Sequence, residues 1–323
     1  MKTRLTEALG ITCPVIQAPM AFAAGGALAS AVSSAGGLGM IGGAYGDAAW
    51  IGQQFDIAAG TRVGCGLITW KLAEQPDLLD QVLARDPAAL FLSFGNPAPF
   101  APAIMEAGVP LICQVQTLRD ARQALDCGAD IIVAQGAEAG GHGEARGTFA
   151  LVPEIADEIA RQNNEALLCA AGGISDGRGL AAALMLGADG AVIGTRFWAS
   201  HEALVHPRIL DRALDATGDD TVRTVVVDVV RGFNWPRRYN GRVLRNPFIQ
   251  KWHGAEDALK LEAGIEAAKW AAAQEAGNLD VATAFAGEGI GLISSAAPAG
   301  DILAKLMADV QRCLAEAASV AER

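Results

Sequence analysis

The chain lacks the paired cysteines and the apolar leader that would place it among secreted proteins. Its six cysteines are scattered through 323 residues and no C-x-x-C occurs, while Cys65, Cys113 and Cys169 lie inside apolar runs. This pattern predicts buried free thiols in a reducing compartment and excludes a disulfide framework. Residues Met1 to Glu7 lack the apolar core of a signal peptide, so we expect a cytoplasmic protein.

Positive charge is also scarce. Lysine and arginine together number 25 against 36 aspartates and glutamates, which gives a formal net charge of −11. This balance disfavours nucleic acid or an anionic membrane surface as a main partner. The densest basic pair is Arg237-Arg238, which we interpret as part of a solvated loop.

Several catalytic and metal-binding motifs are missing. No H-E-x-x-H, Walker A, G-x-S-x-G or clustered Cys/His pattern occurs, so zinc, nucleoside triphosphate and serine-hydrolase functions lack support and no metal site is predicted. The charge-free stretch from Ala8 to Gly46 is long enough to span a bilayer. It contains Pro14, Pro19 and nine glycines, however, so we interpret it as a strand, a small-residue helix and a second strand.

Short apolar runs and clustered glycines are what the chain has in plenty. Eight runs of strand length recur with helix-like segments between them, and their starts lie 19 to 37 residues apart. Each interval fits one strand, one helix and two turns, so the chain is predicted to be an α/β protein, a parallel (β/α)8 TIM barrel. The predicted strands are Val15–Met20, Gly37–Gly43, Val63–Ile68, Ala89–Phe94, Pro110–Val115, Ala129–Gln135, Ala166–Gly173 and Gly190–Phe197. Helical spacing marks Asp77–Arg85, Ala101–Ala107, Leu118–Cys127, Glu154–Gln162 and Arg178–Gly187.

The predicted barrel leaves a long tail. The last strand ends near Phe197, and 126 residues follow. Helical pieces, the β-rich run Thr224–Val230 and the arginine-rich stretch Arg231–Arg245 predict a mainly helical lid subdomain at residues 201–280. Residues 1–200 and 281–323 would then form the barrel, with an amphipathic helix over Asp301–Ala317.

The longest interval between predicted strands contains a glycine-rich loop that ends in a histidine, Gln135 to Gly143. Glycines let a backbone approach a ligand closely, and a histidine transfers protons near neutral pH. His142 is therefore the candidate catalytic residue. Gln135 and Gly140 are expected to contact the ligand beside it.

A phosphate site is predicted between the last two strands. Gly172-Gly173 follows the seventh strand and Gly194-Thr195 follows the eighth, so their backbone N–H groups are free to bind an anion, and Ser175 or Asp176 can cap the next helix. Three further residues, Pro19, Met20 and Gly66, would line the rest of the ligand. The G-x-G-x-x-G at Gly37–Gly42 lies within a predicted strand, so it does not fit the dinucleotide fingerprint.

These motifs together resemble the nitronate monooxygenase family, formerly called 2-nitropropane dioxygenases. The similarity rests on the runs Gln17–Met20, Ser34–Gly39, Phe94–Pro97, Gln135–His142, Ala171–Gly179, Gly194–Phe197 and Gly287–Ile293, which span nearly the whole chain. The resemblance implies a barrel that binds FMN without covalent attachment and uses the histidine as catalytic base. The family often has asparagine where this chain has Gly66.

The resemblance implies an enzyme that oxidises alkyl nitronates or nitroalkanes with O2 to carbonyl compounds and nitrite. An FMN-dependent enoyl-acyl-carrier-protein reductase that consumes NAD(P)H is the alternative, because that family resembles the chain in the same motifs. A barrel that binds a phosphorylated ligand without catalysis remains a third hypothesis. A purine-nucleotide dehydrogenase is disfavoured, because no cysteine stands after the sixth strand to act as nucleophile.

Overall fold

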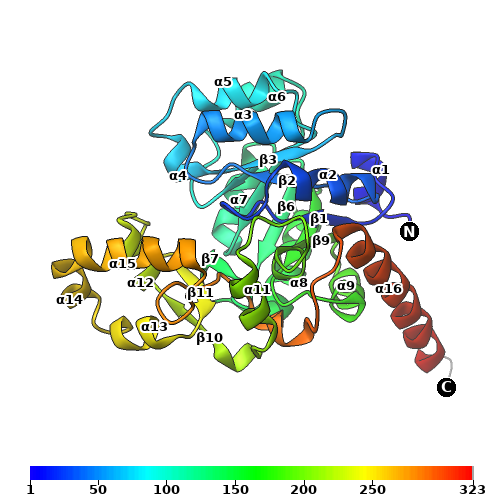
Figure 1. Cartoon of the computed structure of the whole chain (residues 1–323). Helices are drawn as coiled ribbons and strands as arrows, with labels where there is room; N and C mark the ends of the chain where they lie inside the picture. Colours follow the sequence, from blue (N-terminus) through cyan, green and yellow to red (C-terminus); the bar gives the residue numbers. More distant parts are fainter. Residues whose placement is uncertain (322–323) are drawn as a thin grey trace.

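The computed structural model describes the backbone of residues 1–321 and the side chains of residues 1–319. Eight parallel strands form the central barrel, as predicted (Figure 1). An isolated parallel bridge between Ile16 and Leu38 joins the two ends of the sheet. In spatial order the strands are β1 (Val15–Gln17), β9 (Gly190–Ile193), β8 (Leu167–Ala171), β6 (Ile131–Gln135), β5 (Leu111–Val115), β4 (Leu90–Ser93), β3 (Gly64–Ile68) and β2 (Met40–Gly42).

Each predicted strand contains one of these eight, but the last prediction runs too far. The chain leaves β9 after Ile193 and enters the short helix α10 (Thr195–Trp198), where Gly194 breaks the extended backbone. The other helices that follow the barrel strands are α2 (Gly26–Ser34), α3 (Ala48–Ile57), α4 (Thr69–Leu72), α5 (Leu78–Leu83), α6 (Ala101–Glu106), α7 (Leu118–Asp126), α8 (Thr148–Arg161) and α9 (Gly177–Met185).

One helix begins earlier than predicted. The sequence predicts a helix that begins at Glu154, directly after Pro153. In the structure α8 begins at Thr148 and includes this proline. Pro153 is the sixth residue of α8, past the first turn, so the helix continues through it at the cost of one intrahelical hydrogen bond. The amphipathic C-terminal helix is confirmed and longer than predicted, as α16 (Ala299–Ala321), which packs against α9 and α2.

The barrel interior is a closed apolar core. Ile16, Phe91, Val133 and Cys169 fill it, and Leu5 of helix α1 (Arg4–Leu9) packs on its amino end. The amino end is therefore a packed plug, which leaves the carboxyl ends of the strands for a ligand. The glycines at Gly37–Gly42 have a packing reason, since a Cβ on Gly39 would lie 1.8 Å from the carbonyl oxygen of Ala29 in α2.

The segment predicted as a lid, residues 201–280, lies mostly to one side of the barrel mouth (Figure 1). It takes part in a three-stranded antiparallel sheet, of β10 (Thr221–Thr224), β11 (Asn240–Leu244) and β7 (Gly141–Gly143), that the sequence did not predict. Its helices are α12 (Val226–Arg231), α13 (Pro247–Trp252), α14 (Glu256–Leu261) and α15 (Ala263–Ala276). Strand β7 comes from the glycine-histidine loop, so the barrel itself contributes one strand to the lid sheet.

The prediction of a β-rich run over Thr224–Val230 is wrong for most of its length. Only Thr224 belongs to a strand, and the valines form α12. Val226, Val227 and Val230 are buried against α14 and α15, because packing in a helical layer outweighs the modest β preference of valine.

The lid and barrel are joined by α11 (Pro207–Leu214) and by two 3-10 turns, η1 (Gly218–Asp220) and η2 (Glu288–Leu292). Within residues 1–321, no helix combines the length and the apolar character that crossing a membrane requires.

Candidate active site

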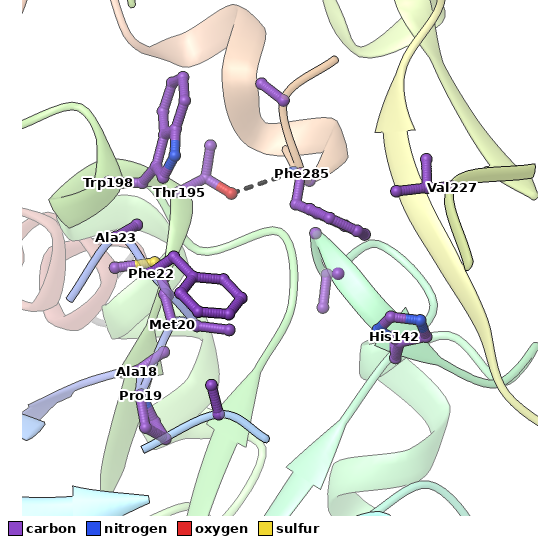
Figure 2. Close-up of a pocket in the computed structure, with 18 of the residues that line it drawn as sticks. Ala18, Pro19, Met20, Phe22, Ala23, His142, Thr195, Trp198, Val227 and Phe285 are labelled. Atoms are coloured by element: carbon purple, nitrogen blue, oxygen red, sulfur yellow. Dashed lines mark hydrogen bonds between the residues drawn. The ribbon is translucent and has the colours of Figure 1, made fainter. Parts of the chain in front are cut away.

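One cavity of about 740 Å³ opens at the carboxyl ends of the barrel strands. Its walls come from the loops after β1, β3, β6, β8 and β9, together with the lid and the segment before η2. All ten predicted site residues line it: Pro19, Met20, Gly66, Gln135, Gly140, His142, Gly172, Gly173, Gly194 and Thr195. Figure 2 shows Pro19 and Met20 on one side and His142 on the other.

The wall near α9 and α10 has the character expected of an anion cradle. Gly172 and Gly173 adopt the left-handed region at φ +108° and +73°. A Cβ on Gly194 would meet only Ala18 at 3.6 Å and Met20 at 3.8 Å, so the protein leaves room in front of this glycine. The residues present therefore fit a phosphorylated group that approaches the backbone.

The cap of α9 is Asp176, one of the two predicted candidates. Its carboxylate accepts the N–H groups of Arg178 and Gly179, and the Arg178 side chain lowers the pKa of Asp176 against the opposing effect of burial. These two donors are engaged within the protein. An anion would consequently rest on the loop before α9 and on Gly194-Thr195 opposite it.

Other glycines of the cavity are explained by contacts within the protein. A Cβ on Gly140 would lie 2.6 Å from the backbone nitrogen of Gly287, where two loops cross. Thr195 fixes the same crossing, because its hydroxyl accepts the N–H of Gly287 at 3.0 Å, the dashed line in Figure 2. A Cβ on Gly66 would overlap Pro19 at 2.3 Å, so glycine at this position makes room for the proline.

His142 lies in β7, between Gly141 and Gly143, and pairs with Gly241 of β11. Its side chain is 8 % exposed and lines the cavity. Strand pairing fixes the backbone at a position where sequence alone suggested a free loop. The candidate base is therefore held rigidly from two sides, by the barrel and by the lid.

The carboxylate partner of His142 comes from the lid. Both side-chain oxygens of Asp228 lie 2.9 Å from Nε2 of His142, and Asp228 is 3 % exposed. The sequence analysis missed Asp228. The available signal was a single charge within the apolar run Thr224–Val230, since a carboxylate there is buried at a cost unless it has a partner.

Burial sets the protonation state of His142. Desolvation lowers the pKa of the imidazole below its usual value, against the opposing effect of Asp228, and the positive charges of Arg231 and Arg223 lower it further. The ring is therefore neutral at pH 7. A neutral ring that donates its Nε2–H to Asp228 keeps the lone pair of Nδ1 to accept a proton.

Aromatic residues gather around this histidine. The Trp235 indole stacks on the imidazole with centroids 3.5 Å apart, and it donates Nε1–H to the Tyr45 hydroxyl at 3.2 Å. Tyr45 stacks in turn on Phe233 at 3.8 Å. Trp235 therefore covers one face of the imidazole and shields it from water, and Tyr45 and Phe233 pack beyond the indole.

Gln135 acts on the backbone of the histidine. Its Nε2 donates to the carbonyl oxygen of His142 at 3.0 Å, while its Oε1 accepts from Gln116 at 2.8 Å and from Gln114 at 3.1 Å. The amide is thus committed to an internal network. A cofactor contact by Gln135 stays a prediction.

The two glutamates that flank His142 in the sequence have other partners. Glu138 accepts from the backbone and hydroxyl of Thr148, and Glu144 pairs with Arg238. Arg238 also pairs with Asp120 of α7, so both residues of the expected solvated pair are exposed but only Arg237 has no ion pair with a described residue.

Comparisons with known proteins agree with this geometry. A family model described as nitronate monooxygenase matches residues 2–60 and 71–309. A nitronate monooxygenase of Neurospora crassa is 34% identical over 337 residues, covering 90% of this chain and 87% of the relative. Among solved structures, FabK from Thermotoga maritima aligns with a TM-score of 0.86 at 30% identity over 99% of both chains. A nitroalkane oxidase from Streptomyces ansochromogenes aligns with a TM-score of 0.79 at 25% identity, over 97% of this chain and 99% of that one.

A parallel barrel with a glycine-rich mouth and a buried histidine beside it defines a flavin-dependent oxidoreductase. Within that class, the chain belongs to the nitronate monooxygenase family. The family acts on small molecules, and the cavity is of the size that such ligands occupy.

Proposed function

We propose that the chain is an FMN-dependent nitronate monooxygenase that oxidises nitroalkanes or alkyl nitronates with O2 to carbonyl compounds and nitrite. The observation that carries the proposal is the buried pair of His142 and Asp228 in the wall of the cavity. Family membership supports the reaction class, and the geometry supports the assignment of the base.

FMN is proposed as the cofactor because the cavity has a wall suited to an anion and, beside it, glycines that let a flat ring lie close to the backbone. Gly172, Gly173, Gly194 and Thr195 would hold its phosphate, and Pro19, Met20, Gly66 and Gly140 would lie along the rest. No close contact within the protein requires glycine at position 194, which supports this assignment. When bound, FMN supplies the redox chemistry with the substrate and O2.

The protein's own part in the reaction is proton transfer. Nδ1 of His142 takes the proton from the carbon next to the nitro group, and Asp228 stabilises the imidazolium that results. The stacked Trp235 excludes water and keeps the ring oriented. A nitronate supplied ready-made no longer carries the acidic proton, so its oxidation does not need the base.

We further propose that residues 201–280 act as a lid and substrate subdomain on a barrel of residues 1–200 and 281–323. The separate apolar cluster of Val222, Val243, Phe248 and Trp270 supports this division. Because α12 of this subdomain carries Asp228, docking of the lid completes the catalytic pair.

The test is a comparison of two substrates on the His142→Ala variant loaded with FMN. Turnover of a neutral nitroalkane should fall about 10²- to 10⁴-fold, whereas turnover of the ready-made nitronate should change much less. Full activity on the nitroalkane would refute the role of His142. Rapid NAD(P)H oxidation that depends on an enoyl thioester would select the reductase instead.

A further inference from the structure

Arg231 occupies an unusual position at the mouth of the cavity. It is the last residue of α12, three positions after Asp228. Among the described residues that line the cavity it is the only arginine or lysine. The same short helix therefore carries the carboxylate that pairs with His142 and a positive charge that borders the ligand space.

Aromatic rings surround the guanidinium. Its Cζ lies 4.7 Å from the ring centroid of Phe233, 5.6 Å from that of Tyr45, 5.9 Å from that of Phe22 and 6.0 Å from that of Phe285. The two phenylalanines Phe22 and Phe285 project into the cavity in Figure 2. Phenylalanine rings attract a cation and hold it in place, yet they accept none of its N–H donors as a carboxylate would.

No carboxylate among residues 1–319 lies within 4.0 Å of Arg231, in contrast to its neighbours. Arg242 pairs with Glu288, and Arg238 pairs with both Asp120 and Glu144. Arg223, which lacks an ion pair, bonds the carbonyl oxygen of Ala137 and the side chain of Asn240. Arg231 thus borders the cavity without a carboxylate ion-pair partner among residues 1–319.

We propose that Arg231 binds the substrate through a planar anion with two oxygens, a nitronate or a carboxylate. The planar guanidinium presents parallel N–H donors whose spacing matches such a group, and the ring surround strengthens the interaction by limiting water. The inference deepens the proposed function and rests on it for the identity of the reacting group. Arg231 would be the residue that selects anionic substrates over neutral molecules of the same size.

The first test measures binding without turnover. Butanoate, an unreactive planar anion, is titrated by calorimetry into the FMN-saturated protein and into its Arg231→Gln and Arg237→Gln variants. Arg237 is the matched control, because it is exposed in the loop that follows α12 and does not line the cavity. Loss of a charge-assisted hydrogen bond should weaken binding to Arg231→Gln about ten- to a hundredfold. Equal affinities for the three proteins would overturn the proposal.

The second test locates the anion on the substrate. The value of kcat/KM is measured for the nitronates of 1-nitrobutane and of 4-nitrobutanoate, which differ by one carboxylate. A loss on both with Arg231→Gln assigns the pairing to the nitronate group, and a loss on the second alone assigns it to the carboxylate. A loss on neither contradicts the proposal. Arg231→Lys, which keeps the charge without the planar donors, should recover only part of the loss.

Failure of the Arg231 proposal can be distinguished from failure of the proposed function. If the wild-type protein oxidises neither nitronate, the proposed reaction is wrong, and the calorimetric comparison still decides whether Arg231 binds anions. Thermal melting of each variant checks that the fold is intact.

Discussion

At the scale of single residues, the glycines of the cavity have two different causes. Gly140 is required by the protein itself, because its Cβ would collide with the backbone of Gly287. Gly194 has a φ of −99°, which other residues adopt, and its Cβ would find ordinary contacts at 3.6 Å and beyond. No contact within the protein requires glycine here, as the proposed phosphate site at this wall would predict.

This difference predicts opposite outcomes for two alanine substitutions. Gly194→Ala should keep the unfolding free energy of the free protein and weaken FMN binding about tenfold or more, because the new methyl group occupies ligand space. Gly140→Ala should lower the unfolding free energy by about 1–3 kcal/mol through overpacking. Urea unfolding of the free protein and FMN titration measure both. Unaltered FMN affinity in Gly194→Ala would show that the phosphate of FMN does not bind at this wall.

The role of Asp228 is also testable at the residue scale. Asp228 raises the pKa of His142 against the stronger lowering by burial, so Asp228→Asn should lower that pKa further. The acid limb of kcat/KM for a neutral nitroalkane should then move to lower pH, since the ring stays neutral to a lower pH. At its plateau kcat should fall about ten- to a hundredfold, because the imidazolium loses a charged hydrogen-bond partner. An unchanged pH profile with unchanged kcat would show that Asp228 does not act through His142.

At the scale of elements, the loop between α12 and β11 brings Trp235 onto the catalytic ring. Arg238 anchors this loop to Asp120 of α7 and to Glu144 beside β7. Half-exposed ion pairs are individually weak, but this one joins three segments that meet only in the folded state. The anchor therefore matters more for the order of the loop than for the stability of the whole chain.

Removal of the anchor should loosen the loop. Arg238→Gln is expected to speed chymotryptic cleavage after Phe233 or Tyr239, and to raise KM for nitroalkanes more than it lowers kcat. Arg237→Gln is the control, because Arg237 has no ion pair with a described residue. Limited proteolysis followed by mass spectrometry compares the two variants, and equal cleavage rates would contradict an anchoring role.

The elements also differ in how far the sequence could predict them. The eight strands were predictable because each buried run has its own apolar signal and a regular spacing. Strand β7 was not, since Gly141-His142-Gly143 has little intrinsic strand preference and its partner β11 lies far along the chain. His142 was predictable because its own glycine-rich loop marks it. Asp228 and Trp235 were not, because they contact His142 only through the tertiary fold.

At the scale of the whole molecule, the cavity is assembled from segments that span nearly the entire chain. Residues from Ala18 to Gly289 line it, so the barrel, the predicted lid and the segment that contains η2 all border the same cavity. A ligand that binds only the folded arrangement must stabilise all of them together, by an amount set by its concentration relative to its dissociation constant.

FMN should therefore raise the melting temperature in a way that depends on its phosphate. At a hundredfold excess over the dissociation constant, the stabilisation is about 2.7 kcal/mol, which corresponds to roughly 4 °C for a chain of this size. Riboflavin, which has the same ring but no phosphate, should give a clearly smaller shift at equal concentration, because it leaves the cradle of Gly173 and Gly194 empty. Differential scanning fluorimetry with both ligands makes the comparison. Equal shifts would mean that the ring alone drives binding, and the two glycine loops would then need another explanation.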